Sequence, residues 1–343
     1  MKNLFLLLFV SSSLFAQINP KILHYSETSG WDHQTRNQSY SMFQQFAFSG
    51  NATVVHDLDG SEFTSLSNLL SYDLIVFSNT SGSAILDSSQ RSHFEQYISN
   101  GGNLLGMHAA SDTYRHSTAN GSPAGFWDFY AETLGGSVQQ APNHVSGTPV
   151  YDISKVASHP SLSNLPDPWA KPEEYYYWEN GYLDTNNAII LKVEQTIGLN
   201  GMVNSYDSAR SVSWYKILPT GSRIFYTSMG HARSNFTTDT LFQSHIFEAS
   251  RWCMGIISSL KERSQEDFKL YPNPAEDYLR ITFPRDISYQ VDYIIRNTQG
   301  QVVKRGTSSL KAKLIDIRDL KSGTYFVQLL NADQSFSATF VKP

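Results

Sequence analysis

The chain has 343 residues, of which 40% are hydrophobic and 17% are charged, and its formal net charge is −5. This composition is too apolar for a disordered chain, and the length favours two domains. The acidic balance and the lack of a Lys/Arg cluster exclude a phosphate-tracking groove, so we expect no nucleic-acid partner.

The first residues have the organisation of an export signal. Lys2 gives a positive start, residues 4–10 form a short apolar run, and small residues lead to a cleavage point after Ala16. The apolar run is too short to span a bilayer, and no later segment is long and apolar enough to do so. We therefore expect a signal peptide at 1–16 and a protein that is secreted or held at the cell surface, without a transmembrane segment.

Strand and helix patterns alternate over residues 20–257. The expected strands are residues 21–25, 53–56, 73–77, 103–107, 145–153, 188–193, 211–218 and 223–227. The expected helices are residues 40–50, 63–70, 87–98 and 240–255. This alternation predicts an α/β domain with a doubly wound, mostly parallel sheet of the flavodoxin type.

The character of the chain changes after this domain. Residues 258–267 are polar and charged, which is typical of a linker. Short β-type runs separated by turn residues follow at 279–283, 293–295, 301–303, 314–317, 325–329 and 336–341. Residues 268–343 are therefore predicted to form a small all-β sandwich.

Three motifs in the C-terminal domain resemble type IX secretion sorting domains. They are Leu-Tyr-Pro-Asn-Pro-Ala at 270–275, Asn-Thr-Gln-Gly-Gln-Val-Val at 297–303 and Leu-Lys-Ser-Gly-Thr-Tyr-Phe-Val at 320–327. The resemblance implies export through the outer membrane and contact of residues 268–343 with the type IX secretion machinery, with release or surface attachment afterwards. The alternative is an adhesive β-domain of general type.

Polar side chains follow the ends of several expected strands of the α/β domain. Trp31 and His33 come after the first strand, His108 and Asp112 after the fourth, and His231 after the last. Doubly wound sheets bind ligands beyond the carboxyl ends of their strands. We therefore expect these residues to meet at one edge of the sheet.

Four segments of this domain resemble the ThuA-like (trehalose utilisation) family. They are the glycine-rich strand and His-Asp loop at 101–113, the His-Pro segment at 159–166, the acidic segment at 173–176 and the Gly-His turn at 223–231. Glu173 stands where the family usually has aspartate. The resemblance covers residues 21–255 and implies a class I glutamine amidotransferase-like fold and a link to trehalose and related sugar metabolism.

The nucleophile of true glutaminases is absent from the corresponding turn. Those enzymes carry a cysteine after the strand that here ends at Met107, because a thiolate must form the thioester. This chain has His108 and Ala109 there, and its single cysteine, Cys253, lies in an apolar helical run. We therefore predict that the protein is not a glutaminase and that Cys253 is a core residue.

Acid–base chemistry by histidine and carboxylate remains, since imidazole titrates near neutrality. The candidate catalytic residues are His108, Asp112, Glu174 and His231. The candidate substrate-binding residues are Trp31, His33, Tyr114 and Tyr176. Three hypotheses stay open: an enzyme acting on a sugar or sugar derivative, such as a hydrolase or isomerase; a non-catalytic carbohydrate-binding protein; and a metal-dependent hydrolase, since two histidines and a carboxylate can hold a divalent metal.

Overall fold

The computed structural model describes residues 20–50, 52–122, 127–256, 269–282, 291–297, 302–308, 314–331 and 334–343. The chain divides into two compact units, with the boundary between Ser259 and Leu260. The predicted signal peptide (1–16) and the predicted linker (258–267) lie outside the described residues.

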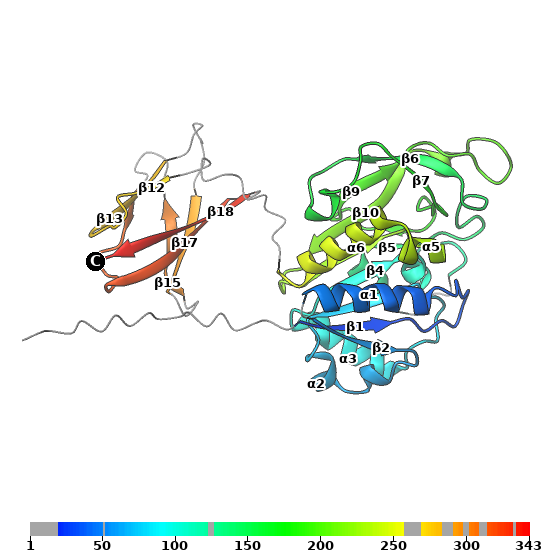
Figure 1. The fold of residues 1–343 in the computed structure, drawn as a ribbon, viewed down its shortest axis with the longest axis horizontal. Coiled ribbons are helices and arrows are strands. Elements are labelled where there is room, and N and C mark those ends of the chain that lie inside the picture. The colour runs from blue at the N-terminus through cyan, green and yellow to red at the C-terminus, as the bar shows by residue number, and fades with distance from the viewer. Residues whose placement is uncertain are drawn as a thin grey trace, which may run out of the picture. The chain divides into compact units, whose positions relative to one another are not determined.

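A nine-stranded sheet forms the centre of the N-terminal unit, in the order β2-β1-β3-β4-β11-β10-β9-β6-β7 (Figure 1). Its strands are β1 (Lys21–Tyr25), β2 (Thr53–Asp57), β3 (Leu74–Ser78), β4 (Leu104–Met107), β6 (Val150–Lys155), β7 (Trp169–Pro172), β9 (Ala188–Val193), β10 (Arg210–Ile217) and β11 (Arg223–Thr227). Strands β2 to β11 of that order pair in parallel, and the remaining strands pair antiparallel. A separate ribbon joins β5 (Gly136–Ser137) to β8 (Tyr182–Leu183). The predicted α/β fold class is confirmed.

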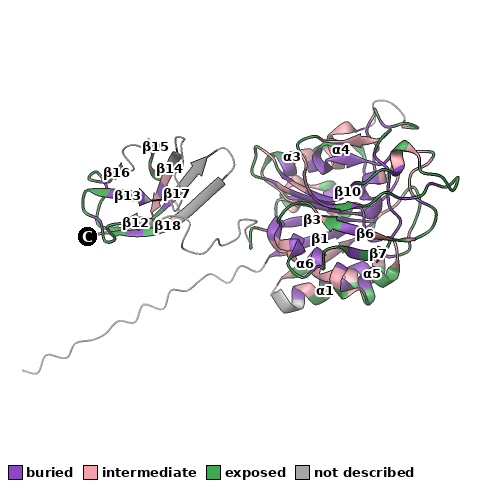
Figure 2. Ribbon diagram, turned by 90° about the horizontal axis from the view of Figure 1, so that it is seen from above, coloured by how far each residue is buried: buried purple, intermediate pink, exposed green. Residues whose placement is uncertain are grey.

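Helices cover both faces of this sheet (Figure 2). Because side chains alternate along a strand, Leu74 and Val76 of β3 belong to one hydrophobic cluster, and Ile75 belongs to the other. The first cluster includes side chains of α1 (Arg36–Gly50), α5 (Arg233–Thr237) and α6 (Thr240–Cys253). The second includes side chains of α2 (Leu66–Leu69), α3 (Ser88–Ser99) and α4 (Asp128–Leu134). Short 3-10 turns also occur: η1 (Ser61–Thr64), η2 (His108–Asp112), η3 (Pro160–Leu162) and η4 (Ser205–Asp207).

Two predicted elements are wrong in their bounds. The helix expected at 63–70 is split into η1 and α2, because Ser65 between them has extended backbone (φ −142°, ψ 128°). The strand expected at 145–153 begins only at Val150. Gly147, with φ +61°, and Pro149 interrupt an extended run there.

The C-terminal unit consists of antiparallel sheets, as predicted. One sheet contains β12 (Lys269–Tyr271), β13 (Tyr278–Thr282) and β16 (Leu314–Asp316). The other contains β14 (Val291–Asn297), β15 (Val302–Ser308), β17 (Gly323–Asn331) and β18 (Gln334–Lys342). Leu279, Ile295, Val327 and Phe340 are among the buried side chains that form its own core.

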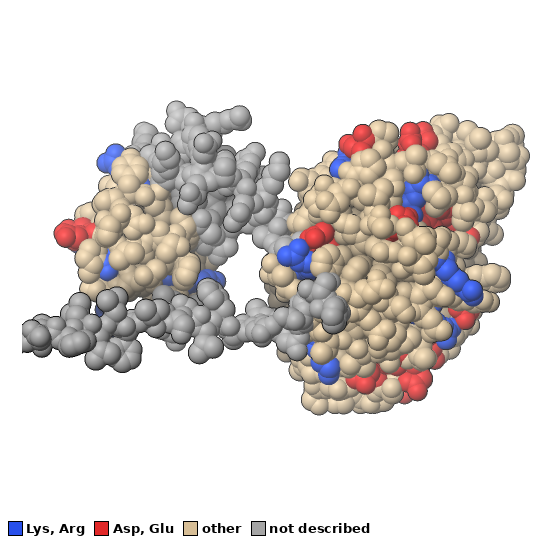
Figure 3. All heavy atoms as spheres, viewed as in Figure 1, with Lys and Arg blue, Asp and Glu red and all other residues tan. Residues whose placement is uncertain are grey.

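Acidic and basic side chains are interspersed on the face seen in Figure 3, in agreement with the mixed charge of the sequence. Within the part of the chain that the structure describes, no helix has the length and apolar character needed to cross a membrane.

Candidate active site

Four ionisable side chains meet beyond the carboxyl ends of the parallel strands. His33 lies in the loop after β1, His108 follows β4 directly, and His231 follows β11. Glu174 comes just after β7. One nitrogen from each imidazole and one oxygen of the carboxylate all lie within 4.8 Å of one another. We call these four residues the His/Glu centre.

A strained turn directs His108 into this centre. Its backbone is left-handed, with φ +47°, which is costly for a residue with a Cβ atom. The turn leads from the buried strand β4 straight into η2, so the imidazole leaves the end of the strand instead of continuing along it. This is the turn where the resemblance places the cysteine of glutaminases.

The hydrogen bonds of His108 determine which ring nitrogen is free. Nδ1 lies 2.7 Å from the carbonyl oxygen of Ser228. A carbonyl can only accept, so Nδ1 carries the proton and Nε2 of the neutral ring has its lone pair. That lone pair faces His33 Nε2 at 3.2 Å and Glu174 Oε2 at 3.3 Å.

The carboxylate of Glu174 is held in its ionised form. Burial alone raises the pKa of Glu174, but hydrogen bonds with His108, His231 and His33 outweigh it and keep the pKa well below its ordinary value. Oε2 lies 3.2 Å from Nδ1 of His231, and Oε1 lies 3.3 Å from Nδ1 of His144.

The pKa values of the two flanking imidazoles, His33 and His231, are shifted in opposite directions. Burial lowers the pKa of His33 to about 4, against the pull of Glu174, so this ring is neutral at pH 7. The hydrogen bond with Glu174 raises the pKa of His231, although burial opposes it. The His231 side chain is 30% exposed, so it is the imidazole of the centre most open to solvent.

Glu173 fixes the turn that carries His231. Successive residues of an extended segment point to opposite sides, so Glu173 faces away from the centre while Glu174 faces into it. Its carboxylate accepts hydrogen bonds from the backbone N–H groups of Gly230 (2.9 Å) and His231 (3.1 Å). Lys171 Nζ lies 3.8 Å from the same carboxylate, and both side chains are buried.

Asn79, at the end of β3, ties three of the surrounding loops together. Its amide nitrogen donates to Thr35 Oγ1 (2.7 Å), after His33, and to the carbonyl of Gly230 (2.9 Å), before His231. Its amide oxygen accepts from the N–H of Ala109 at 3.4 Å, next to His108. The histidines are thus supported by one side chain at the sheet edge.

Comparison with known proteins identifies the family of the N-terminal unit. The model of the ThuA family, described as trehalose utilisation, matches residues 21–253. The chain belongs to the ThuA family. A second model, described as a secretion system C-terminal sorting domain, matches residues 269–342 and indicates export through that system. No curated protein matches the chain.

Solved structures of ThuA-like proteins share the fold. One from Bacteroides uniformis is 22% identical, with a TM-score of 0.55, over 69% of this chain and 92% of its own. Another from Parabacteroides merdae is 15% identical, with a TM-score of 0.51, over 72% of this chain and 94% of its own. At these identities the likeness concerns the fold of the ThuA domain alone.

The predicted catalytic residues of the ThuA domain converge only in part. His108, Glu174 and His231 meet in the centre. The strand-end geometry predicted this for His108 and His231, and the resemblance supplied Glu174. Asp112 lies outside it. Its carboxylate pairs with the Nε of Arg115 at 2.6 Å, and burial raises the pKa of Asp112 although Arg115 opposes the shift.

The predicted substrate-binding residues are also divided. His33 is part of the centre, and the Tyr176 ring stacks on His108 with its hydroxyl 3.1 Å from Nε2. Trp31 is 72% exposed on the same loop as His33. Tyr114 is fully buried in the core of the ThuA domain, where its hydroxyl donates to the carbonyl of Leu86, so the structure does not bring it to the site.

His144 is a residue of the site that the sequence did not reveal. Besides its contact with Glu174, it is connected to the segment of Tyr176 by an isolated β-bridge. It lies in irregular backbone outside any strand end, so neither periodicity nor the strand-end rule singled it out. Its side chain is 28% exposed at the edge of the centre.

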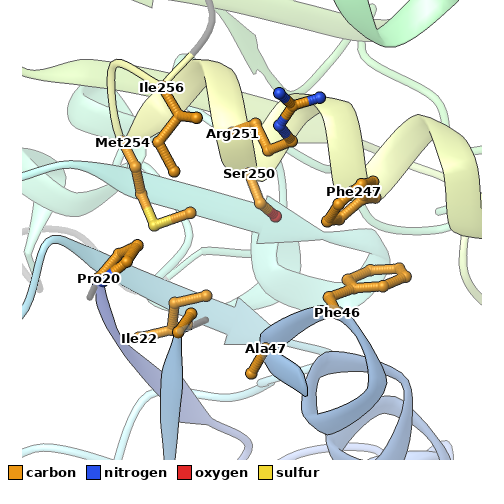
Figure 4. Close-up of a pocket in the computed structure, with 10 residues that line it drawn as sticks. Pro20, Ile22, Phe46, Ala47, Phe247, Ser250, Arg251, Met254 and Ile256 are labelled. Carbon is orange, nitrogen blue, oxygen red and sulfur yellow. The ribbon is translucent and has the colours of Figure 1, made fainter. Parts of the chain in front are cut away.

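An apolar cavity of about 240 Å³ lies at the amino end of β1, away from this centre (Figure 4). Ile22, Phe46, Phe247 and Met254 are among its lining residues. Its charged group, Arg251, is paired with Glu248. The cavity therefore lacks the titratable cluster that acid–base chemistry needs.

Proposed function

We propose that this exported ThuA-family protein acts on a sugar or sugar derivative of the trehalose or keto-sugar type, by non-covalent acid–base chemistry at the His/Glu centre. The observation that carries the proposal is the convergence of Glu174 with three imidazoles at the carboxyl edge of the sheet. The family description, trehalose utilisation, supports the substrate class.

The residues have separate roles in this proposal. His231 exchanges the proton, because its side chain is partly exposed and its hydrogen bond with Glu174 favours the protonated ring and raises its pKa. Glu174 stabilises the charge that forms on His231. Tyr176 and the Asp112–Arg115 pair supply hydroxyl, carboxylate and guanidinium groups to hold sugar hydroxyls.

Covalent glutaminase chemistry is not part of the proposal. The turn after β4 presents the imidazole of His108, which cannot form a thioester. Cys253 is buried in α6, where its Sγ contacts the carbonyl of Leu104, and burial raises the pKa of its thiol.

A second candidate is a carbohydrate-binding protein without turnover. The exposed Trp31 ring, on the loop that also carries His33, supports it, since exposed indoles stack on sugar faces. Calorimetry against oligosaccharides tests it: saturable binding that a Trp31→Ala variant loses, with no product formed, would favour this candidate over catalysis.

Turnover is tested with the mature full-length chain. A panel of disaccharides, keto-sugars and glycosides is incubated with the protein, and products are followed by NMR. We expect turnover that is lost in Glu174→Gln and His108→Ala and kept in His93→Ala, a matched histidine on α3 that binds the carbonyl of Phe63. Wild-type turnover no greater than that of His108→Ala on every substrate would refute the catalytic proposal.

Export defines where this chemistry takes place. We propose cleavage after Ala16, a ThuA domain over 20–257, a linker at 258–267 and a type IX sorting domain at 268–343 that is removed on release or surface attachment. Mass spectrometry of the protein from medium and from cell surface tests this: mature termini at neither 17 nor near 268 would contradict it.

A further inference from the structure

We propose that His33, His108, Glu174 and His231 form a binding site for one divalent transition metal ion. The inference deepens the proposed function and rests on it only in using the same centre, with His231 acting as a ligand, and not as the proton-exchanging group, while the ion is bound. The donor set identifies the class of ion. Three imidazole nitrogens and a single carboxylate oxygen suit zinc, cobalt, nickel, manganese or iron, whereas calcium and magnesium require mostly oxygen ligands.

The separations between the donor atoms match a coordination sphere. For metal–ligand distances of about 2.0–2.1 Å, neighbouring ligands of a tetrahedral ion lie about 3.3 Å apart. Here His108 Nε2 lies 3.2 Å from His33 Nε2 and 3.4 Å from His231 Nδ1. Glu174 Oε2 lies 3.3 Å from His108, 3.2 Å from His231 and 3.9 Å from His33.

The tautomer of His108 presents a metal-ligating nitrogen to the centre. The Ser228 carbonyl accepts the hydrogen bond from Nδ1–H of His108. Nε2 of the neutral ring therefore carries a lone pair. That nitrogen lies 3.3 Å from Glu174 Oε2, so a cation between the two atoms would be bound by both. A cation placed among the four donor atoms would be bound by all of them.

The surroundings also orient the ligands, as protein groups around a metal site do. The Ser228 carbonyl fixes the tautomer of His108, and Nδ1 of His144, which also contacts the Val145 carbonyl, lies 3.3 Å from the second carboxylate oxygen of Glu174. Glu173 holds the backbone of His231. The partly exposed His231 and His144 leave one side of the centre open to solvent, where an ion can enter.

The test measures bound metal directly, in the mature full-length chain made without a polyhistidine tag. Bound metal is removed with a chelator, and the protein is dialysed against Zn²⁺, Co²⁺, Ni²⁺ or Mn²⁺. After desalting, the metal content is measured by inductively coupled plasma mass spectrometry. Cobalt-loaded protein is also examined by visible absorption, which reports the coordination geometry. We expect about one ion per chain for at least one metal.

Variants show whether these residues hold the ion. Glu174→Gln and His33→Ala should weaken metal binding at least about 100-fold in competition titrations. His93→Ala, on α3, should bind as the wild type does, and circular dichroism checks that each variant is folded. Less than a tenth of an ion per chain for every metal, or unchanged affinity in folded Glu174→Gln and His33→Ala, would overturn the proposal.

The outcomes separate the site from the function. Stripped protein that binds no metal but turns over a sugar refutes the metal site and keeps the catalytic proposal. Loaded protein that loses its ion in Glu174→Gln but transforms no sugar supports the metal site and refutes the sugar chemistry.

Discussion

Replacing Glu173 by glutamine should destabilise the ThuA domain far more than its conservative size suggests. The buried carboxylate accepts from the N–H groups of Gly230 and His231 and from Asn235 Nδ2 (3.3 Å), with Lys171 nearby. Glutamine has one acceptor oxygen and turns an NH₂ group toward these donors. The variant therefore loses a charge and leaves buried donors without an acceptor.

The expected cost follows from these contacts. Removing one partner of a buried ion pair costs about 3–5 kcal/mol, and a hydrogen bond to a charged group contributes about 1.5–3 kcal/mol. Lys171 keeps a second partner, Asp239, at 2.6 Å. We therefore expect the lower end, about 3 kcal/mol, which corresponds to a fall in Tm of about 6–12 °C for a domain of this size.

Tryptophan fluorescence measures this cost in the full chain. All the tryptophans lie in the ThuA domain: Trp31, Trp127, Trp169, Trp178, Trp214 and Trp252. Urea unfolding of Glu173→Gln is compared with Glu248→Gln, which breaks a partly exposed pair with Arg251 at 3.1 Å and should cost less than about 1 kcal/mol. Equal midpoints for the two variants would show that Glu173 is not the anchor of this turn.

Three other predictions concern the core. Gly106→Ala should lower the free energy of unfolding by about 1–3 kcal/mol, because a Cβ atom would lie 2.5 Å from Leu134 Cδ1; wild-type stability in urea would contradict this packing. Burial lowers the pKa of His24 to about 3 and that of His245 to about 4, so the unfolded chain binds more protons below pH 6.5. The free energy of unfolding should then fall by about 1.4 kcal/mol per pH unit for each histidine as the pH drops from 6.5 toward 4, and His245→Gln should flatten the pH dependence. Cys253 should resist thiol reagents in the native protein and react fully in denaturant, and rapid native labelling would show that the end of α6 is open.

The parallel half of the sheet could be predicted because its strands are short, apolar runs between amphipathic helices. The antiparallel half was harder to predict. Trp169, Ala170 and Lys171 alternate between buried and exposed on β7, but the buried member Lys171 is charged. Its ion pairs with Asp239 and Glu173 are made far along the chain, so no local pattern indicates that it is buried.

The candidate site was predictable to the same extent. His108 follows β4 directly and His231 lies four residues after the end of β11, so the topology brings them together, and the resemblance added Glu174. Asp112 was misplaced because the 3-10 turn that begins at His108 carries it toward Arg115. The support from His144 depends on a loop conformation that strand positions do not determine.

The His/Glu centre also joins parts of the chain that are remote in sequence. His33 and His108 are 75 residues apart, and His108 and His231 are 123 residues apart. A ligand held by all of them acts as a removable cross-link that closes long loops, in a chain whose single cysteine excludes an intrachain disulfide. At a free concentration 100 times its Kd, such a ligand adds about 2.7 kcal/mol to stability. For an exported protein, we therefore expect that occupancy of this centre increases resistance to proteolysis outside the cell.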